Sequence, residues 1–347
     1  MRVKVKGNAY MKIHQRNVYD KQVYYRLIAL WVICESFAGG IMHGIKLPFT
    51  GLIVSSLAIT CIILIAFHYP SRTSVIKATL LVAVFKLMLS PHSPPTAYIA
   101  VFFQGITGQL LLRSPRFFKT GAIILSVLAL VESAIQRLLV LLVVYGNNLW
   151  DAVNLFIQKI TNESTQTNYS LFITVSYVVF HGIAGIFIGV YAVRLAIFSK
   201  SEDETISRYL FRHAEDKPDN SEILKKRGNK KWIFSLILFL LAFLYLQGML
   251  QPSKPIVPKG VIVHMMLRAG LILLTWYLVA GPLIVYFLKK LLRGQQQKYS
   301  HEVDEIMALL PKTRNIFTTS IRVSKKGKGF SRLKLFLKLM LVNVLKN

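Results

Sequence analysis

Four residues with titratable side chains interrupt long apolar stretches of the sequence: Glu35, Glu132, Arg137 and His181. A charge at the centre of a bilayer costs at least about 2.5–3.5 kcal/mol, so each charged group needs a partner. Glu132 and Arg137 are five residues apart, which is about 500° of helical turn and places them on different faces of one helix. We therefore expect Glu35 to pair with Arg137, with His181 completing the cluster. Such a cluster is either a structural ion pair that fixes helix packing, or a polar pocket floor or proton relay.

Motifs for enzymatic chemistry are absent from the sequence. It contains no GxxxxGK[ST] phosphate loop, no HExxH pair, no GxSxG nucleophile elbow and no Cys/His set at zinc spacing. The two cysteines, Cys34 and Cys61, both lie in apolar runs. We expect a protein that is not an enzyme and has neither a metal site nor a cofactor.

The composition predicts that these residues are held by transmembrane helices. Apolar residues make up 54% of the 347 residues and charged residues 17%, against about 45–50% and about 25% in soluble domains. The fold class is therefore all-α, a polytopic membrane protein. A span needs about 20 apolar residues, and eight stretches qualify, the third being the shortest: 27–45, 48–67, 75–89, 96–112, 118–145, 171–198, 232–250 and 261–288. The proline-rich stretch 90–95 must form a turn, because proline interrupts a helix.

The basic residues predict the orientation of these spans. The chain has 43 Lys and Arg against 15 Asp and Glu, a net charge of +28. Most of the cations fall on one side of the predicted membrane, and the opposite loops hold only Lys46, Lys159, Lys254 and Lys259. By the positive-inside rule both termini are cytoplasmic. The charge thus reflects topology and contact with anionic membrane lipids, and it predicts no nucleic acid partner.

Charge runs and loop lengths predict the organisation of the chain. We expect a basic N-terminus (1–26), a six-helix membrane domain (27–198), a charged linker (199–231), a two-helix membrane module (232–288) and a basic amphipathic tail (289–347). Apolar residues from Leu149 to Ile160 recur at helical spacing, which predicts an amphipathic interfacial helix. In the tail we expect a helix that stops at Pro311. The last 17 residues either lie in the membrane interface or dock on a partner.

Small residues predict where helices pack closely. Gly182, Gly185 and Gly189 mark one face of the sixth span, and the spacing of the last two allows another helix to approach its backbone. Lys86 and Arg268 lie toward the outer ends of their spans. Long side chains at such positions extend to the surface, so neither residue needs a partner inside the bundle.

The order of these features resembles a known transporter family. Residues 22–198 contain a first helix that leads into a short outer turn (MHGIKLPFTGLIVSS), a proline-rich outer loop before a glycine-bearing helix (SPPTAYIAVFFQGITGQLLL) and a glycine-rich sixth helix. This pattern is similar to the substrate-binding (S) component of energy-coupling-factor transporters, the bacterial vitamin and metal uptake systems. The module from residue 222 onward resembles, in outline, a shortened coupling subunit.

The resemblance implies a site that opens to the outside of the cell. In that family the outer loops and the outer helix halves hold the ligand. The matching positions in this sequence are His43, Lys46, His92, Ser93, Thr96, Tyr98, Asn147, Asn148, Trp150 and Asp151, with Gln104 and His181 deeper.

Three functions fit these features. The first is an S-component-like transport protein in the cell inner (cytoplasmic) membrane, which binds a small vitamin-like or metal-like solute and relies on a separate ABC-type ATPase and a coupling subunit. The second is a membrane scaffold or envelope-assembly protein whose basic tail recruits a partner or anionic lipid. The third is a proton-coupled carrier that uses the Glu35, Glu132, Arg137 and His181 cluster.

Overall fold

A computed structural model of the chain describes residues 21–38, 50–90, 93–161, 168–200, 209–211 and 259–346, and the regular structure within them is helical. The chain divides into two compact units. Unit 1 contains residues 1–130, 183–218 and 288–347, and unit 2 contains residues 131–182 and 219–287.

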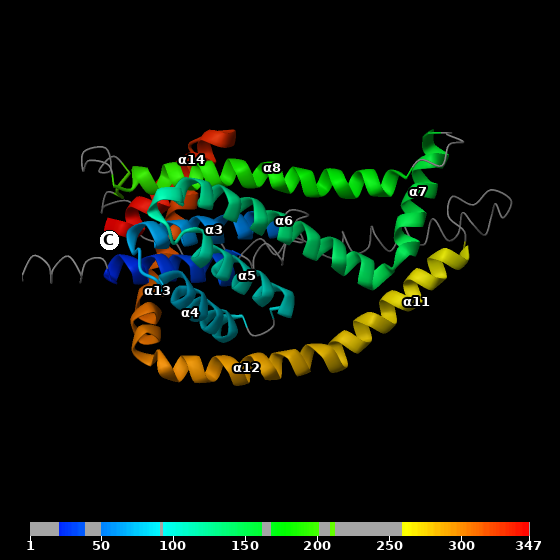
Figure 1. Cartoon of the computed structure of the whole chain (residues 1–347), viewed down its shortest axis with the longest axis horizontal. Helices are drawn as coiled ribbons and strands as arrows, with labels where there is room; N and C mark the ends of the chain where they lie inside the picture. The colour runs from blue at the N-terminus through cyan, green and yellow to red at the C-terminus, as the bar shows by residue number, and fades with distance from the viewer. Residues whose placement is uncertain are drawn as a thin grey trace, which may run out of the picture. The chain divides into compact units, whose positions relative to one another are not determined.

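The centre of unit 1 is a bundle of four neighbouring helices (Figure 1). They are the first helix (residues 21–33, continued by the π-helix η1, Cys34–Ala38), α3 (Thr50–His68), α4 (Ser74–Leu89) and α5 (Pro95–Leu111). Every side chain from Leu27 to Cys34 is buried, as expected for an apolar helix enclosed by others. α5 begins at Pro95, because proline fits the first turn of a helix but not its interior.

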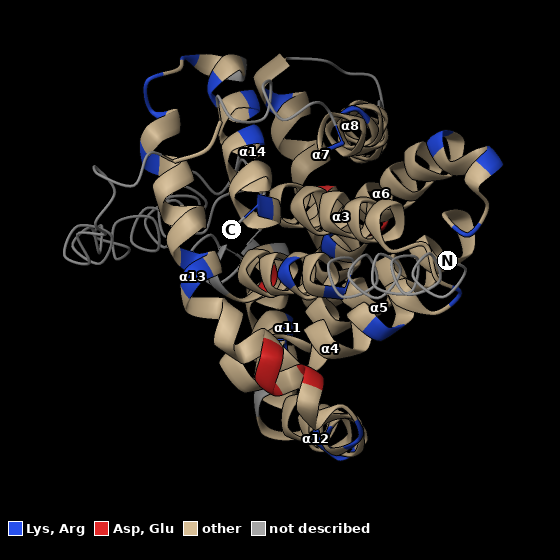
Figure 2. Cartoon of the chain, turned by 90° about the vertical axis from the view of Figure 1, so that its left-hand side faces the viewer, with Lys and Arg blue, Asp and Glu red and all other residues tan. Residues whose placement is uncertain are grey.

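Unit 1 also contains two amphipathic helices from the C-terminal part of the chain. These two helices are α13 (Ser300–Ser324) and α14 (Gly329–Lys346). In the sequence they come after the short helix η2 (Pro115–Phe117), α6 (Phe118–Tyr145), α8 (Tyr169–Phe198) and α12 (Gly281–Lys298). α13 and α14 pack against each other (Figure 2). Asn343 of α14 binds the short segment 209–211, donating to the carbonyl oxygen of Tyr209 (2.8 Å) and accepting from the N–H of Phe211 (3.0 Å).

The prediction that a helix stops at Pro311 is wrong, because α13 continues through it. An interior proline costs about 3 kcal/mol. Ile306 and Leu310 before it, and Ile316 and Phe317 after it, are all buried. Each such side chain contributes about 1.5–3 kcal/mol, so burial on both sides outweighs the cost of the proline.

The final stretch of the tail packs on its own chain. Met340, Leu341 and Val344 of α14 are buried in the hydrophobic core of unit 1. Arg26 of the first helix donates from Nη1 to the carbonyl oxygen of Leu345 (2.9 Å). The apolar residues that we expected in the interface or on a partner are therefore covered by unit 1.

Unit 2 contains the remaining parts of α6 and α8, together with α7 (Asn147–Thr161), α11 (Lys259–Thr275) and the π-helix η3 (Trp276–Ala280). α7 is the helix that the apolar spacing predicts. Gly146 ends α6 with φ of 69°, and its N–H donates to the carbonyl oxygen of Leu142 (2.8 Å). Arg268 of α11 donates from Nε to the carbonyl oxygen of Val143 (3.4 Å), where a cation also complements the helix dipole.

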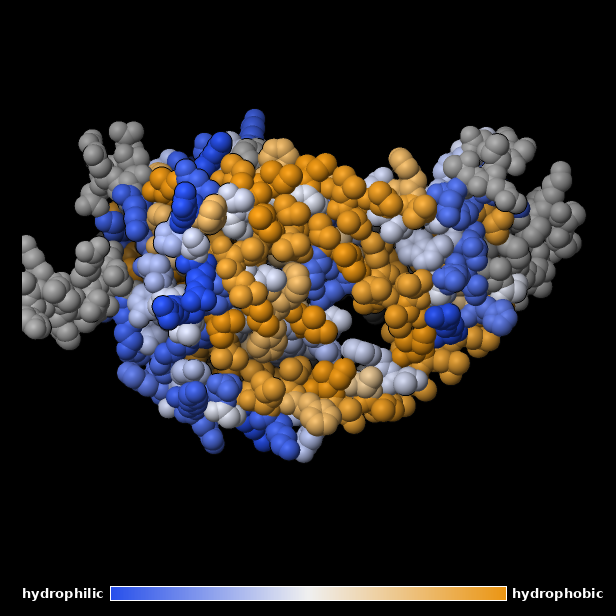
Figure 3. All heavy atoms as spheres, in the orientation of Figure 1, coloured by the Kyte–Doolittle hydropathy of each residue, from blue (hydrophilic) through white to orange (hydrophobic). Residues whose placement is uncertain are grey.

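Four helices in the described residues are long and apolar enough to cross a membrane: Thr50–His68, Pro115–Tyr145, Tyr169–Phe198 and Ile262–Lys298. The predicted spans 75–89 and 96–112 correspond to α4 and α5, of 16 and 17 residues. Residues 39–45 of the first predicted span and all of 232–250 lie outside the described residues. Phe172 and Phe187 of α8 are 73% and 71% exposed, and apolar side chains cover the face over this helix (Figure 3). These surfaces indicate a multi-pass membrane protein.

One ion pair joins α13 to the start of α4. Lys77 Nζ lies 2.5 Å from Glu302 Oε1 and 5.0 Å from the ring centre of Tyr299. Partial burial acts to raise the pKa of Glu302, but the hydrogen bond from Lys77, a backbone hydrogen bond and nearby positive charge together hold the pKa below its ordinary value of 4.5.

We expect the contribution of this pair to the α13 attachment to decrease as the pH falls below 4.5. A lowered pKa means that the folded state binds fewer protons than the unfolded state, so the stabilisation is complete above pH 4.5 and is lost as the pH falls through the folded pKa. Because the pair is partly exposed, the loss is below about 1 kcal/mol. Thermal unfolding of the wild type and Glu302→Gln between about pH 3 and pH 7 measures it. Curves that stay equally far apart at every pH would contradict the assignment.

Candidate functional site

Polar side chains gather at one end of the unit 1 bundle, where η1 meets the last turn of α4. Lys86 Nζ lies 2.5 Å from Glu35 Oε2, and each side chain is only 5% exposed. Ser90, which follows α4, donates from its hydroxyl to the carbonyl oxygen of Ser36 (3.5 Å). A buried ion pair inside an apolar bundle therefore connects the end of the first helix to the end of α4.

Local backbone structure places these groups. Glu35 and Ser36 lie in η1, and π-helical turns within α-helices occur frequently at functional sites. The N–H of Ser90 donates to the carbonyl oxygen of Lys86 (2.9 Å) and closes the end of α4. The next helix, α5, begins at Pro95 and holds Tyr98 in the same unit.

Several buried polar atoms in this bundle have no hydrogen-bond partner among the described residues. They are Trp31 Nε1, Ser36 Oγ, Tyr98 Oη and Gln104 Oε1. Gln104 also donates from Nε2 to Ser55 Oγ (3.2 Å), so only its carbonyl oxygen is without a partner. A buried polar atom without a partner costs about 1–3 kcal/mol, and such atoms mark positions that a bound molecule can satisfy. Tyr98 and Gln104 are both positions that the sequence singles out.

The predicted pairing of Glu35 with Arg137 is wrong, because Glu35 pairs with Lys86. Contrary to our expectation, Lys86 therefore does not extend to the surface. Glu132 instead accepts a hydrogen bond from Gln136, one turn along α6. The partner of Glu35 is decided by which helix lies beside η1, and that helix is α4. The spacing of residues along one helix does not reveal which helices are neighbours.

His181 is buried within α8 and donates from Nδ1 to the carbonyl oxygen of Tyr177 (2.9 Å), one turn back. Its ring centre lies 4.3 Å from that of Tyr177. This arrangement is typical of a histidine that packs inside a helix bundle.

The other predicted binding residues are divided among the units. Ser93, just before α5, and Thr96, in its first turn, are half-buried in unit 1. Asn147, Asn148, Trp150 and Asp151 lie on the first turns of α7 in unit 2. His43, Lys46 and His92 lie outside the described residues. Within the described residues no group of three His, Cys, Asp or Glu side chains is placed to hold a metal ion.

The glycines of α8 lie against α6. A Cβ at Gly185 would be 2.6 Å from the Cα of Val127, and one at Gly189 would be 2.7 Å from the Cα of Ile123. Within unit 2, a Cβ at Gly182 would meet only Val131 Cγ2, at 3.7 Å. Two of the three glycines therefore permit contact between backbones.

The fold and this site define a multi-pass α-helical membrane protein with a buried polar cluster at one end of a helical bundle. No known protein family, curated protein or solved structure matches the chain.

Proposed function

We propose that the chain is an S-component-like transport protein, which binds a small solute at the polar end of unit 1 and depends on a separate ABC-type ATPase and coupling subunit for energy. The observation that carries this proposal is the buried Glu35–Lys86 pair with the hydroxyl groups of Ser36 and Tyr98, which have no partner in the described part of the chain. Charges in a membrane bundle are costly and mark substrate pathways.

The chemistry of this cluster favours a small polar solute. Lys86 supplies a cation, Glu35 an anion, and the hydroxyls of Ser36 and Tyr98 can donate or accept. Trp31, fully buried one turn before Glu35, adds an aromatic ring and an N–H donor. A vitamin-like solute with a ring and charged or polar substituents matches these groups.

A ligand screen tests the proposal directly. The purified protein is unfolded thermally with a panel of water-soluble vitamins and divalent transition-metal ions, and native mass spectrometry searches for a molecule that co-purifies. A true ligand at about 100 times its Kd raises the free energy of unfolding by about 2.7 kcal/mol. Tyr98→Phe, which removes one hydroxyl, should weaken binding about tenfold.

Tyr286→Phe is the matched control, because Tyr286 is 63% exposed and lies in α12 of unit 2. It should leave ligand binding unchanged. Co-expression with an ABC-type ATPase pair and a coupling subunit should yield a complex that takes up the same solute with ATP. Absence of both a stabilising solute and an ATPase complex would contradict the proposal.

A second candidate, a proton-coupled carrier, is supported by Glu132. Its Oε2 is buried in α6 with no hydrogen-bond partner among the described residues, while Gln136 donates to Oε1. A carboxyl group inside a candidate span can carry a proton. Solute uptake driven by a proton gradient and abolished by Glu132→Gln, with ATPase association unaffected, would favour this carrier over the first proposal.

A further inference from the structure

A pocket of ≈ 560 Å³ lies at the other end of the unit 1 bundle, away from the Glu35–Lys86 pair. Its wall is formed by the end of α3, the turn into α4, the end of α5, the start of α6 and the last turns of α8. Three of the four candidate membrane spans therefore begin or end at this pocket. In a membrane protein the ends of spans lie at the depth of the lipid headgroups.

The charged side chains that line the pocket are all cations. Arg72, Arg113 and Lys119 line it, and no described residue of the lining carries a carboxylate. None of these three cations forms an ion pair within the described residues. Lys200 adds a fourth cation beside the pocket, with its Nζ 4.6 Å from the ring centre of Phe67. The pocket is thus suited to an anion.

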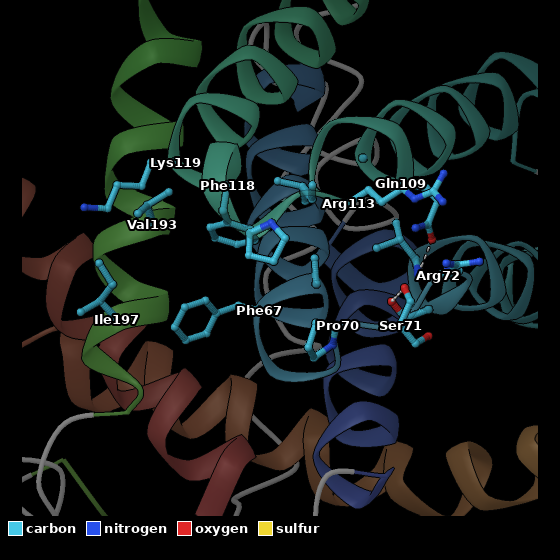
Figure 4. A pocket seen from close by; sticks show the side chains of 16 residues that line it. Phe67, Pro70, Ser71, Arg72, Gln109, Arg113, Phe118, Lys119, Val193 and Ile197 are labelled. Carbon is cyan, nitrogen blue, oxygen red and sulfur yellow. Dashed lines mark hydrogen bonds between the residues drawn. The ribbon is translucent and has the colours of Figure 1, made fainter.

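The cations flank an apolar floor. Figure 4 shows Arg72 and Arg113 on one side, beside Gln109, and Lys119 on the opposite side, with the rings of Phe67 and Phe118 between them. The carbonyl oxygen of the Gln109 side chain accepts from the N–H groups of Val75 (3.1 Å) and Ile76 (3.3 Å). These bonds fix the side chain and leave its amide nitrogen as a donor at the edge of the pocket.

The apolar wall continues to the exposed surface of α8. Val193 and Ile197 of α8 complete the lining, and Ile197 is 51% exposed. A site for a free inorganic anion has no need of such a wall. A ligand with an anionic head and an apolar body uses both the cations and the wall.

We propose that this pocket binds the phosphate group of an anionic phospholipid from the adjacent leaflet. The phosphate lies by Arg72 and Arg113, with Gln109 as a further donor, and the beginning of an acyl chain follows Phe118, Val193 and Ile197. A soluble phosphate ester carries the same anionic phosphate as the lipid. The apolar wall favours the lipid over the soluble ester. This site is independent of the solute site proposed above.

Native mass spectrometry with defined lipids tests the proposal. Delipidated full-length protein is titrated with phosphatidylglycerol or phosphatidylcholine, and glycerol 3-phosphate serves as the soluble probe. We expect phosphatidylglycerol to bind with preference. The double variant Arg72→Gln/Arg113→Gln should lower its affinity about 30-fold, because two cations at about 1 kcal/mol each correspond to that ratio.

Arg116→Gln is the matched control. Arg116 is exposed in η2, three residues from Arg113, and is not part of the pocket lining. This variant should retain the preference, and thermal unfolding checks that all variants are folded. The proposal is overturned if phosphatidylcholine binds equally well, if Arg116→Gln loses as much affinity as the double variant, or if glycerol 3-phosphate stabilises the protein as much as the lipid does.

Discussion

Replacing Lys86 with methionine should destabilise the protein by about 3–5 kcal/mol. The ammonium group of Lys86 is paired at 2.5 Å with Glu35, and both side chains are 5% exposed. Methionine preserves the unbranched shape of the lysine stem and removes the charge. The carboxylate of Glu35 then remains buried without its partner, and breaking a buried pair in this way is costly.

The double variant separates the cost of an unpaired charge from the value of the pair. Glu35→Met alone should destabilise the protein by a similar amount, because it leaves the Lys86 cation unpaired. Glu35→Met/Lys86→Met removes both charges, and we expect it to lie closer to the wild type than either single variant. Unfolding in detergent for all four proteins gives the coupling energy.

Lys325→Met is the control for the substitution itself. Lys325 is exposed at the end of α13, so its replacement should change the free energy of unfolding by less than about 0.5 kcal/mol. Additive effects of the two single variants at Glu35 and Lys86 would show that the ion pair does not hold the end of the bundle together.

The positions of several described helices follow closely from the sequence. The predicted spans 48–67 and 118–145 correspond to α3 (Thr50–His68) and α6 (Phe118–Tyr145). Continuous apolar runs with flanking prolines and charges define such helices locally, because every turn in a bilayer must satisfy its own hydrogen bonds. Helix α7 was likewise predictable from apolar periodicity.

Tertiary contacts were less predictable. Lys86 lies near the end of its helix, where a long side chain usually reaches water, yet packing beside η1 buries it against Glu35. Pro311 ends a helix in isolation, but buried neighbours on both sides keep α13 continuous. In both cases the decisive interaction comes from another part of the chain.

The basic pocket was missed for a different reason. Arg72 and Arg113 lie in two short connections and Lys119 at the start of the following span, all on the same predicted side of the membrane. The positive-inside rule accounts for them without any site. Only the neighbouring positions of the α3–α4 turn, the α5–α6 turn and α8 bring them around one cavity. Polar residues of α5 such as Tyr98 and Gln104 could be selected from sequence, but their burial could not.

Alanine at Gly185 or Gly189 should destabilise the protein by about 1–3 kcal/mol, whereas alanine at Gly182 on the same helix should not. A Cβ at Gly185 would lie 2.6 Å from the Cα of Val127 and 2.9 Å from the carbonyl oxygen of Ser126. These are backbone atoms of α6, so only separation of the two helices can relieve the overlap.

Gly189 is constrained in the same way, since its Cβ would lie 2.7 Å from the Cα of Ile123. At Gly182 the nearest atom would be Val131 Cγ2, at 3.7 Å, which is ordinary contact. Alanine forms helix more readily than glycine by about 1 kcal/mol, so Gly182→Ala should be neutral or stabilising. Thermal unfolding of the three single variants in one detergent decides the matter. Equal effects at all three positions would mean that the glycines act through helix propensity, and that α8 does not rest on the backbone of α6.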